Sequence, residues 1–202
     1  MKFDDVHDIQ QAYRKLVDCN ANPGRVHSLR IESEKMGFPI YCNKALLVLA
    51  RMLLDTEVCF HVIGKASEII SNTISQLTYT VAAPLDEADY VFVAADADSK
   101  ELIASIIKCK LGDLINPHSS ATLIIEAEKI TEDRDLMLRG PGIKESNYLC
   151  VETAADWVTA RAVKNIEYPL GIEIYFVDKE YRIAALPRTT VIQSRGDKAW
   201  AM

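Results

Sequence analysis

The run Asp89-Tyr90-Val91-Phe92-Val93-Ala94 decides the fold class of this chain. Its continuous apolar centre is typical of a strand that is covered on both faces of a sheet. Asp98 follows shortly after, and Glu101 comes three residues later, which is the pattern of a capping box at the start of a helix. Apolar residues continue this helix at helical spacing, and Gly112 is expected to end it. The strand and its helix predict an α/β protein.

Helices are also predicted before this strand. Asp8 is expected to cap the first one, with Gln11 at the capping-box position. Asn22-Pro23-Gly24 should end it in a type II turn, because glycine tolerates the positive φ that this turn requires. Val26–Ile31 is then predicted as a short strand. Asn43 is expected to cap a second helix that runs to Leu54 and is apolar nearly all round.

The next segments continue the alternation of strands and helices. Glu57–Ile63 is a strand signal that Gly64 ends, and apolar residues at helical spacing over 69–77 indicate a third helix. After the strand at 89–94, the pattern changes. Thr122–Ala127 and Asp135–Arg139 are predicted to form a hairpin, followed by a helix around Thr153–Asn165.

Gly171–Val177 and Tyr181–Leu186 are predicted to form a second hairpin. Alternating strands and helices followed by hairpins imply a mixed sheet with helices on both faces. We therefore predict a three-layer α/β/α fold in one domain over residues 1–202. Its core is expected over residues 8–193, and residues 194–202 form a polar tail.

Composition excludes several classes of protein. The net charge of −6 and the pI near 5.3 argue against a large nucleic-acid interface. No apolar run approaches the roughly 20 residues that cross a bilayer, and the acidic first residues do not resemble a secretory signal. Five cysteines are widely spaced without a C-x-x-C pair, which disfavours zinc and disulfides. The sequence predicts a cytoplasmic protein with no bound metal, no nucleic-acid partner and no membrane contact.

One glycine-rich loop is a candidate for binding an anion. The chain has no G-x-x-x-x-G-K-[ST] motif, so a Walker-type nucleotide site is excluded. Gly140-Pro141-Gly142 is the best remaining loop, because its backbone N–H groups can approach an anion closely. Arg139 would add a charge-assisted contact. The alternative is a tight turn that leaves a strand.

Two other segments carry candidate chemistry. Pro187-Arg188-Thr189-Thr190 places an arginine beside two hydroxyls, which suits a phosphate, a carboxylate or the acidic group of a partner. The alternative for this run is a solvated strand end. Asp96 and Asp98 follow the strand at 89–94, where ligands of open α/β sheets usually gather. They suit Mg²⁺ chemically, but Asp98 is already assigned to the helix cap.

Together these motifs resemble the PhnH family, the H subunit of the carbon–phosphorus lyase core complex. In the amino-terminal segment the resemblance rests on Tyr13-Arg14 and Pro23-Gly24. In the last third it rests on three further runs, in this order: Gly140-Pro141-Gly142, Pro169-Leu170-Gly171 and Pro187-Arg188-Thr189-Thr190. It covers roughly residues 8–193. Many members have a methionine-serine pair before the Pro-Gly turn, whereas this chain has Asn20-Ala21.

The resemblance implies a fold similar to the large domain of pyridoxal-phosphate (PLP)-dependent transferases, without PLP or another cofactor. It implies a homodimer that also joins the G, I and J subunits of the core complex, in the synthase that makes α-D-ribose 1-methylphosphonate 5-triphosphate. The role expected for this chain is structural, since no catalytic residue is identifiable in it. The alternative is a stand-alone binder or transferase for a phosphorylated small molecule, using the Gly140–Gly142 loop and Arg188.

Overall fold

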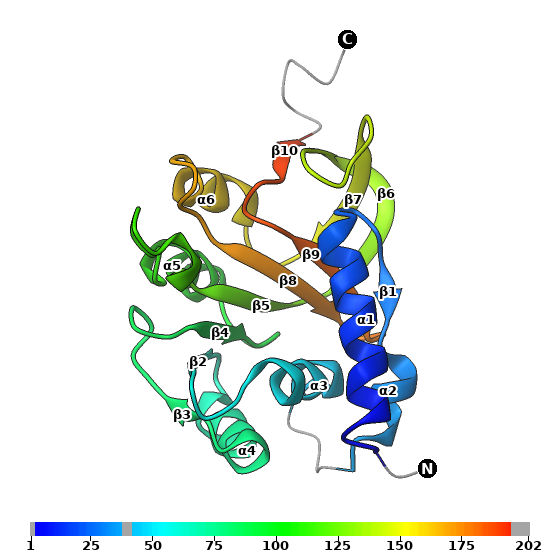
Figure 1. Cartoon of the computed structure of the whole chain (residues 1–202), viewed down its shortest axis with the longest axis vertical. Helices are drawn as coiled ribbons and strands as arrows, with labels where there is room; N and C mark the ends of the chain where they lie inside the picture. Colours follow the sequence, from blue (N-terminus) through cyan, green and yellow to red (C-terminus); the bar gives the residue numbers. More distant parts are fainter. Residues whose placement is uncertain (1–2, 38–41, 195–202) are drawn as a thin grey trace.

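The computed structural model describes residues 3–37 and 42–194, and it is built around a seven-stranded mixed sheet (Figure 1). The strand order is β1-β9-β8-β5-β4-β2-β3. Strands β3, β2, β4, β5 and β8 are parallel, whereas β9 and β1 run antiparallel to their neighbours. The strands are β1 (His27–Ser28), β2 (Cys59–Ile63), β3 (Val81–Ala82), β4 (Tyr90–Val93), β5 (Thr122–Ala127), β8 (Glu173–Asp178) and β9 (Arg182–Leu186).

Strand β4 lies inside the sheet, as the apolar run at 89–94 predicts. Val91 pairs with His61 of β2 on one side and with Leu123 of β5 on the other, both in parallel register. Val91, Phe92 and Val93 are buried. The predicted mixed sheet and the predicted hairpin of β8 with β9 are confirmed.

The sheet separates two hydrophobic cores, because successive side chains of a strand point to opposite faces. Phe92 and Ile124 belong to the core that contains residues of α1, α3 and α4, whereas Val91 and Leu123 belong to the core that contains residues of α5 and α6. The helices are α1 (His7–Ala21), α2 (Arg30–Lys35), α3 (Lys44–Leu53), α4 (Ser67–Thr78), α5 (Ser99–Lys108) and α6 (Trp157–Lys164). Helices therefore cover both faces of the sheet (Figure 1).

A second sheet has the order β10-β6-β7, and the sequence did not indicate it. Its strands are β6 (Lys129–Arg139), β7 (Asn147–Glu152) and β10 (Val191–Ser194). The predicted hairpin of Thr122–Ala127 with Asp135–Arg139 is wrong, since β5 pairs with β4 and β8 while β6 pairs with β7 and β10. The polar segment 128–134 suggested a loop. Residues 129–134 instead belong to the first half of β6, in which the register of the pairing with β7 shifts between Thr131 and Leu136.

Three local predictions are corrected by hydrogen bonds. Asp8 does not cap α1: it lies inside the first turn, and the backbone N–H groups of Val6 and His7 donate to Asp4 instead. Val26–Ile31 contains only the two-residue strand β1, and α2 already begins at Arg30. Helix α5 ends at Lys108, four residues before Gly112.

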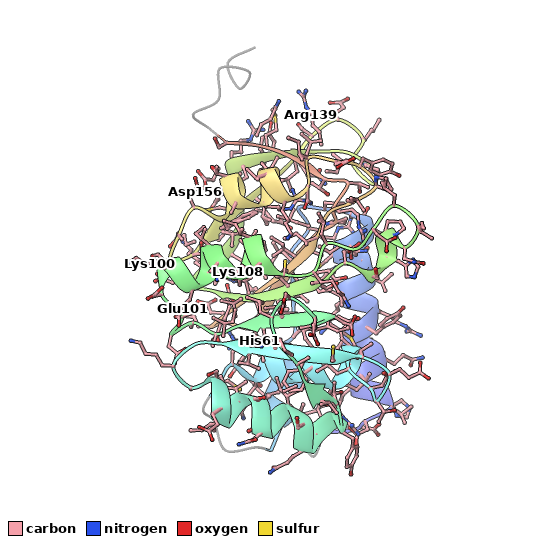
Figure 2. All side chains as sticks on the ribbon, turned by 90° about the vertical axis from the view of Figure 1, so that its left-hand side faces the viewer. His61, Lys100, Glu101, Lys108, Arg139 and Asp156 are labelled. Atoms are coloured by element: carbon pink, nitrogen blue, oxygen red, sulfur yellow. The ribbon has the colours of Figure 1, made fainter. Side chains whose placement is uncertain are left out.

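The other capping predictions are confirmed. Asn43 accepts a hydrogen bond from the backbone N–H of Ala45 at the start of α3. Asp98 and Glu101 form a complete capping box at the start of α5. Figure 2 shows Glu101 and Lys108 toward opposite ends of this helix. Helix α1 ends at Ala21, and Arg25 N–H donates to Asn22 O across a turn in which Gly24 has a φ of +97°.

Candidate functional site

The structure brings the motifs of three distant segments together at the carboxyl end of α1. A Cβ on Gly142 would overlap the Ala21 carbonyl oxygen. A Cβ on Gly140 would lie 2.8 Å from the Thr189 carbonyl oxygen. The Gly140–Gly142 loop is therefore wedged between the end of α1 and the segment that leads into β10. We call these contacts the glycine junction.

The Pro23-Gly24 turn completes the glycine junction. The side-chain amide of Asn147 donates to the Pro23 carbonyl at 2.7 Å. A Cβ on Gly24 would come within 2.8 Å of the Cβ of Asn147. All three glycines of these motifs, Gly24, Gly140 and Gly142, have positive φ values, of +97°, +137° and +82°. Close packing and backbone conformation both require glycine here.

A buried arginine that the sequence did not single out holds the Pro187–Thr190 run in place. Arg161 of α6 is 3% exposed, and it donates to the carbonyl oxygens of Pro187 at 2.6 Å and of Thr190 at 3.1 Å. Burial lowers the pKa of Arg161 to about 10, so the guanidinium stays charged at neutral pH. Its contacts are to carbonyl dipoles, and no carboxylate is paired with it among the described residues.

Arg188 also contacts other parts of the chain. Its Nη1 donates to the carbonyl oxygens of Pro117 and Pro169, and its Nη2 lies 3.6 Å from a carboxylate oxygen of Glu173. A Cβ on Gly171 would lie 3.1 Å from the Cβ of Arg188. The Pro169-Leu170-Gly171 and Pro187–Thr190 motifs are thus in direct contact through this arginine.

Other predicted site residues lie apart from these contacts. Tyr13 is 54% exposed on α1, and Arg14 beside it is exposed as well. Arg139 is exposed at the end of β6, and Figure 2 shows it near one end of the molecule. The predicted tail 194–202 lies outside the described residues except for Ser194.

A polar groove borders the glycine junction. Its volume is about 420 Å³, and it is lined by Asn22, Gly24, Arg25, Glu132, Gly142, Lys144, Ser146, Asn147 and Tyr148. Arg25 is already paired with Asp18 at 2.9 Å, and Glu132 accepts a hydrogen bond from the backbone N–H of Val26. Arg25 and Glu132 in the groove therefore already have partners, and Lys144 lines the same groove at an exposed position.

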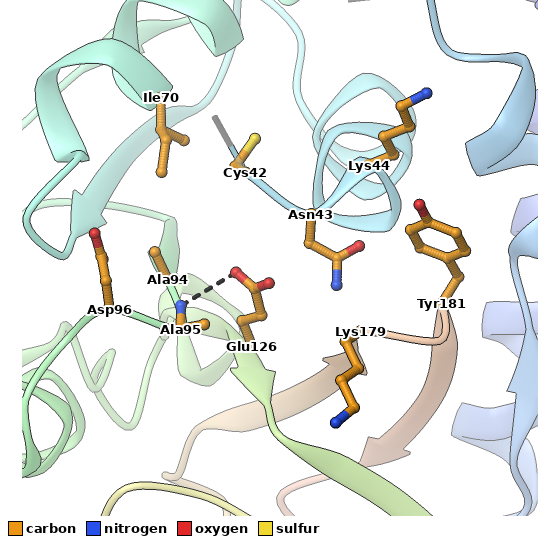
Figure 3. Close-up of a pocket in the computed structure, with 10 residues that line it drawn as sticks. All are labelled: Cys42, Asn43, Lys44, Ile70, Ala94, Ala95, Asp96, Glu126, Lys179 and Tyr181. Atoms are coloured by element: carbon orange, nitrogen blue, oxygen red, sulfur yellow. Dashed lines mark hydrogen bonds between the residues drawn. The ribbon is translucent and has the colours of Figure 1, made fainter. Parts of the chain in front are cut away.

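A second cavity, which we call the edge cavity, lies at the carboxyl ends of β4, β5 and β8 (Figure 3). Its volume is about 320 Å³. It is lined by Cys42, Asn43, Lys44, Ile70, Ala94, Ala95, Asp96, Glu126, Lys179 and Tyr181. The start of α3 forms one wall, and the segment that follows β4 forms another.

Glu126 is the central polar group of the edge cavity. Its carboxylate accepts a hydrogen bond from the backbone N–H of Ala95 at 3.1 Å, and it points toward the side-chain amide of Asn43 (Figure 3). Burial raises the pKa of Glu126, and the Ala95 N–H acts in the opposite direction. Glu126 is thus a half-buried carboxyl group whose charged form is disfavoured by burial and stabilised by the Ala95 N–H.

Asp96 and Asp98, the two aspartates considered for Mg²⁺ from the sequence, accept hydrogen bonds at the starts of two different helices. Asp96 accepts hydrogen bonds from the backbone N–H groups of Lys65 and Ala66 before α4, and Asp98 caps α5. Over residues 3–37 and 42–194, no cluster of three or more His, Cys, Asp or Glu side chains is suited to a metal ion. In the same residues no helix is long and apolar enough to cross a membrane.

The cysteines of the described segments are poor nucleophiles. Burial raises the pKa of Cys42 in the edge cavity to about 11, and it raises the pKa of Cys109 to about 11 as well. Since the thiolate is the reactive form, neither thiol is activated. The edge cavity therefore offers carboxyl, amide and ammonium groups for binding rather than a nucleophile.

Sequence patterns gave only weak signals for the two most informative residues. Arg161 of α6 and Asn165, the residue after the end of α6, lie four residues apart, and both contact the Pro187–Thr190 run. This i,i+4 spacing of two polar residues was the available signal. Glu126 interrupts the apolar strand β5 at its end, and a lone carboxylate there marks the edge of the sheet where ligands gather.

The buried guanidinium of Arg161 predicts a measurable effect on stability. We expect Arg161→Met to lower the free energy of unfolding by about 2 kcal/mol, because two carbonyl groups lose charge-assisted hydrogen bonds. Urea denaturation followed by circular dichroism measures this difference. Arg30→Met is the matched control, since Arg30 is exposed and should change stability by less than about 0.5 kcal/mol. Equal effects of the two substitutions would contradict the role given to Arg161.

The fold and the glycine junction define the class of protein. It is an α/β protein with a mixed seven-stranded sheet, a second sheet of three strands, and a glycine loop packed against the end of α1. The family model described as "Bacterial phosphonate metabolism protein (PhnH)" matches residues 2–193. The chain belongs to the PhnH family.

Two curated relatives agree with this assignment. The chain is 29% identical over 188 residues to the "Putative C-P lyase subunit protein HtxG" of Stutzerimonas stutzeri, covering 93% of this chain and 87% of that protein. It is 26% identical over 199 residues to the "Alpha-D-ribose 1-methylphosphonate 5-triphosphate synthase subunit PhnH" of Rhizobium meliloti (strain 1021), covering 94% and 92%. The similarity is therefore full-length in both cases.

Proposed function

We propose that this chain is the H subunit of α-D-ribose 1-methylphosphonate 5-triphosphate synthase, within a carbon–phosphorus lyase complex. The observation that carries the proposal is the full-length similarity to the Rhizobium meliloti subunit of that name. The contribution of the chain is mainly to assembly. In support, Arg161, Arg188 and the glycines of the junction have their contacts within the chain.

An exposed apolar surface supports an assembly role. It comprises Ile107, Leu114, Ile115, Val163, Ile166 and Tyr168, each between 55% and 88% exposed. Lys164 joins the ends of α5 and α6 by donating to the carbonyl oxygens of Ile107 and Cys109. Arg188 joins the neighbouring loops by donating to Pro117 and Pro169. An exposed apolar surface of this kind favours contact with another protein. We propose that the other subunits of the synthase bind to it.

The assembly role is tested by co-purification with the G, I and J proteins of the same organism. We expect a stable complex at micromolar concentration with the wild-type chain, and its loss with the double variant Ile115→Ser, Ile166→Ser. Val81→Ser is the matched control, since Val81 is 72% exposed on the edge strand β3 of the sheet. No association of the wild-type chain would overturn the proposal. Association that survives the double variant would overturn the assigned surface.

The proposal includes finer features that the family resemblance implies. The chain forms a homodimer of one domain each, in the cytoplasm, with a fold similar to the large domain of PLP-dependent transferases but without PLP. Light scattering of the purified chain tests the dimer. Visible absorption by the purified protein would indicate bound PLP and would contradict the absence of the cofactor.

The second candidate function is a stand-alone binder or transferase for a phosphorylated small molecule. The observation in its favour is the polar groove at the glycine junction, which places Lys144 beside Gly142. The proposed use of Arg188 predicts lost binding in Arg188→Ala, measured by calorimetry with ATP. However, the contacts of Arg188 with Pro117, Pro169 and Glu173 lead us to expect a lower melting temperature in this variant as well. Lys144→Ala therefore provides the cleaner test of the groove.

A further inference from the structure

We propose that the segment after β10, residues 195–198, binds in a groove of its own chain, with Arg195 paired to Asp135 and Lys198 beside further carboxylates. We call this groove the acidic groove. It includes no residue of the glycine junction or of the exposed apolar surface. The inference therefore does not depend on the proposed function.

The acidic groove lies where the second sheet meets the start of α6. Its volume is about 460 Å³, and β10 and α6 lie at the same end of the molecule (Figure 1). Leu136 of β6, Val151 of β7 and Trp157 of α6 line it and are buried. Ser194, the last residue of β10, lines it as well. The chain therefore leaves β10 at the groove.

The charge of the acidic groove suits a basic segment. Its carboxylates belong to Asp135, Glu152 and Asp156, which are all at exposed positions. Among the described residues that line the groove, none is a lysine, an arginine or a histidine. Within residues 3–37 and 42–194, none of the three carboxylates forms an ion pair. Asp156 accepts hydrogen bonds from the first turn of α6, so Asp135 and Glu152 are the carboxylates with most capacity for a cation.

The sequence supplies a basic segment at this point. Residues 195–202 lie outside the described residues, and they begin with Arg195-Gly196-Asp197-Lys198. Strand β10 pairs with β6 in antiparallel register up to Ser194, which lies opposite Leu136. One further residue in the same register brings Arg195 opposite Asp135. Opposite charges that face each other directly stabilise an antiparallel pair.

The two residues after Arg195 favour an end of the strand. The same register would bring Asp197 opposite Asp133, and like charges that face each other are destabilising. Gly196 has the widest backbone freedom of any residue type. The chain can therefore turn at Gly196, from the direction of β10 toward the start of α6.

Lys198 then comes within reach of the other carboxylates. Three residues of extended chain span about 10 Å, and lysine adds a flexible four-carbon stem. Glu152 at the end of β7 and Asp156 before α6 line the same groove as Asp135. The two cations of the segment thus meet the carboxylates of the groove.

Proteolysis of the chain of 202 residues by endoproteinase Lys-C, which cleaves after lysine, tests the inference. Mass spectrometry follows cleavage after Lys198, since a bound segment is cleaved in proportion to its released fraction. We expect the double variant Asp135→Asn, Glu152→Gln to be cleaved there at least about threefold faster than the wild type, because both ion pairs are lost. Glu128→Gln, Glu145→Gln is the matched control, since it removes two exposed carboxylates outside the groove and should leave the rate unchanged.

A charge reversal identifies the partner of Arg195. Arg195→Asp should speed cleavage after Lys198, and the combination of Arg195→Asp with Asp135→Arg should restore the wild-type rate, because the ion pair is formed again in reverse. Lys-C does not cleave after the new arginine. Thermal unfolding of every variant identifies loss of the fold, and the charge reversal decides the question if the first double variant does not fold.

Two results overturn the inference outright. One is equal cleavage after Lys198 in the wild type and in the groove variants, and the other is a charge reversal that does not restore protection. Protection that rises with protein concentration would assign the bound segment to a second copy of the chain, and it would overturn binding within one chain.

Discussion

Asp178→Ala is expected to lower the free energy of unfolding by about 3–5 kcal/mol, the usual effect of breaking a buried, hydrogen-bonded ion pair. The carboxylate of Asp178 is 0% exposed, and it accepts hydrogen bonds from the backbone N–H groups of Ile130, Glu180 and Arg182. It also pairs with the guanidinium of Arg182 at 2.6 Å. Alanine would leave all of these donors without their acceptor.

The position of Asp178 explains why the effect should be large. Ile130 belongs to β6, whereas Asp178 ends β8 and Arg182 begins β9, so one carboxylate ties the second sheet to the hairpin of the first. Glu180→Ala is the matched control, because Glu180 is an exposed partner of the same arginine at 3.8 Å. Exposed ion pairs contribute about 0–1 kcal/mol. Chemical denaturation curves of both variants give the comparison, and a similar loss in each would refute the role of Asp178.

Gly142→Ala is expected to destabilise the chain by roughly 3 kcal/mol, because two costs combine at this position. The φ of +82° is disfavoured for an L-residue with a side chain, and the added Cβ would overlap the Ala21 carbonyl oxygen at the end of α1. The Gly140–Gly142 loop would have to move away from α1. We therefore expect a lower melting temperature together with weaker assembly.

Gly37→Ala provides the control for Gly142→Ala. A Cβ at Gly37 meets nothing within 4 Å, and Gly37 is not among the glycines with a left-handed φ. This substitution should leave the melting temperature unchanged or slightly higher, since alanine restricts the unfolded chain. A neutral Gly142→Ala, measured by differential scanning calorimetry, would show that the glycine junction has no structural role.

Local sequence was sufficient for several features in which a residue contacts its close neighbours in the chain, although the predicted cap of α1 by Asp8 is wrong. The capping box of Asp98 and Glu101, the Asn43 cap and the Pro23-Gly24 turn depend on residues within three positions, and all are confirmed. The apolar run at 89–94 also predicted correctly a strand buried on both faces. Such features form through short hydrogen bonds and local burial, which the sequence pattern records directly.

Pairing between strands was not predictable in the same way. Thr122–Ala127 and residues 135–139 lie close together in the chain, so a hairpin was the simplest expectation. β5 enters the first sheet because both of its faces are apolar, whereas β6 has polar residues at 131–135 and pairs in the second sheet. The polar character that suggested a loop is tolerated, because those residues are mostly exposed.

For the candidate sites too, the motifs could be found in the sequence, whereas the contacts between distant segments could not. The motifs Gly140–Gly142 and Pro187–Thr190 were visible in the sequence, but their contact with each other and with the end of α1 was not. Arg161, Asp178 and Glu126 were missed, since each acts on residues far away in the chain or on a cavity that exists only in the folded protein.

The sequence by itself determined the α/β class, the caps of α3 and α5, the Pro23-Gly24 turn and the family, because these follow from short-range hydrogen bonding and from motifs that keep their order. Only the tertiary structure decided that the Gly140–Gly142 loop packs against the end of α1, that one buried carboxylate joins the two sheets, and that Glu126 lines a cavity at the carboxyl ends of the strands. Those features depend on which distant segments pack together, and that choice is made by the burial of whole faces rather than by any local run of residues.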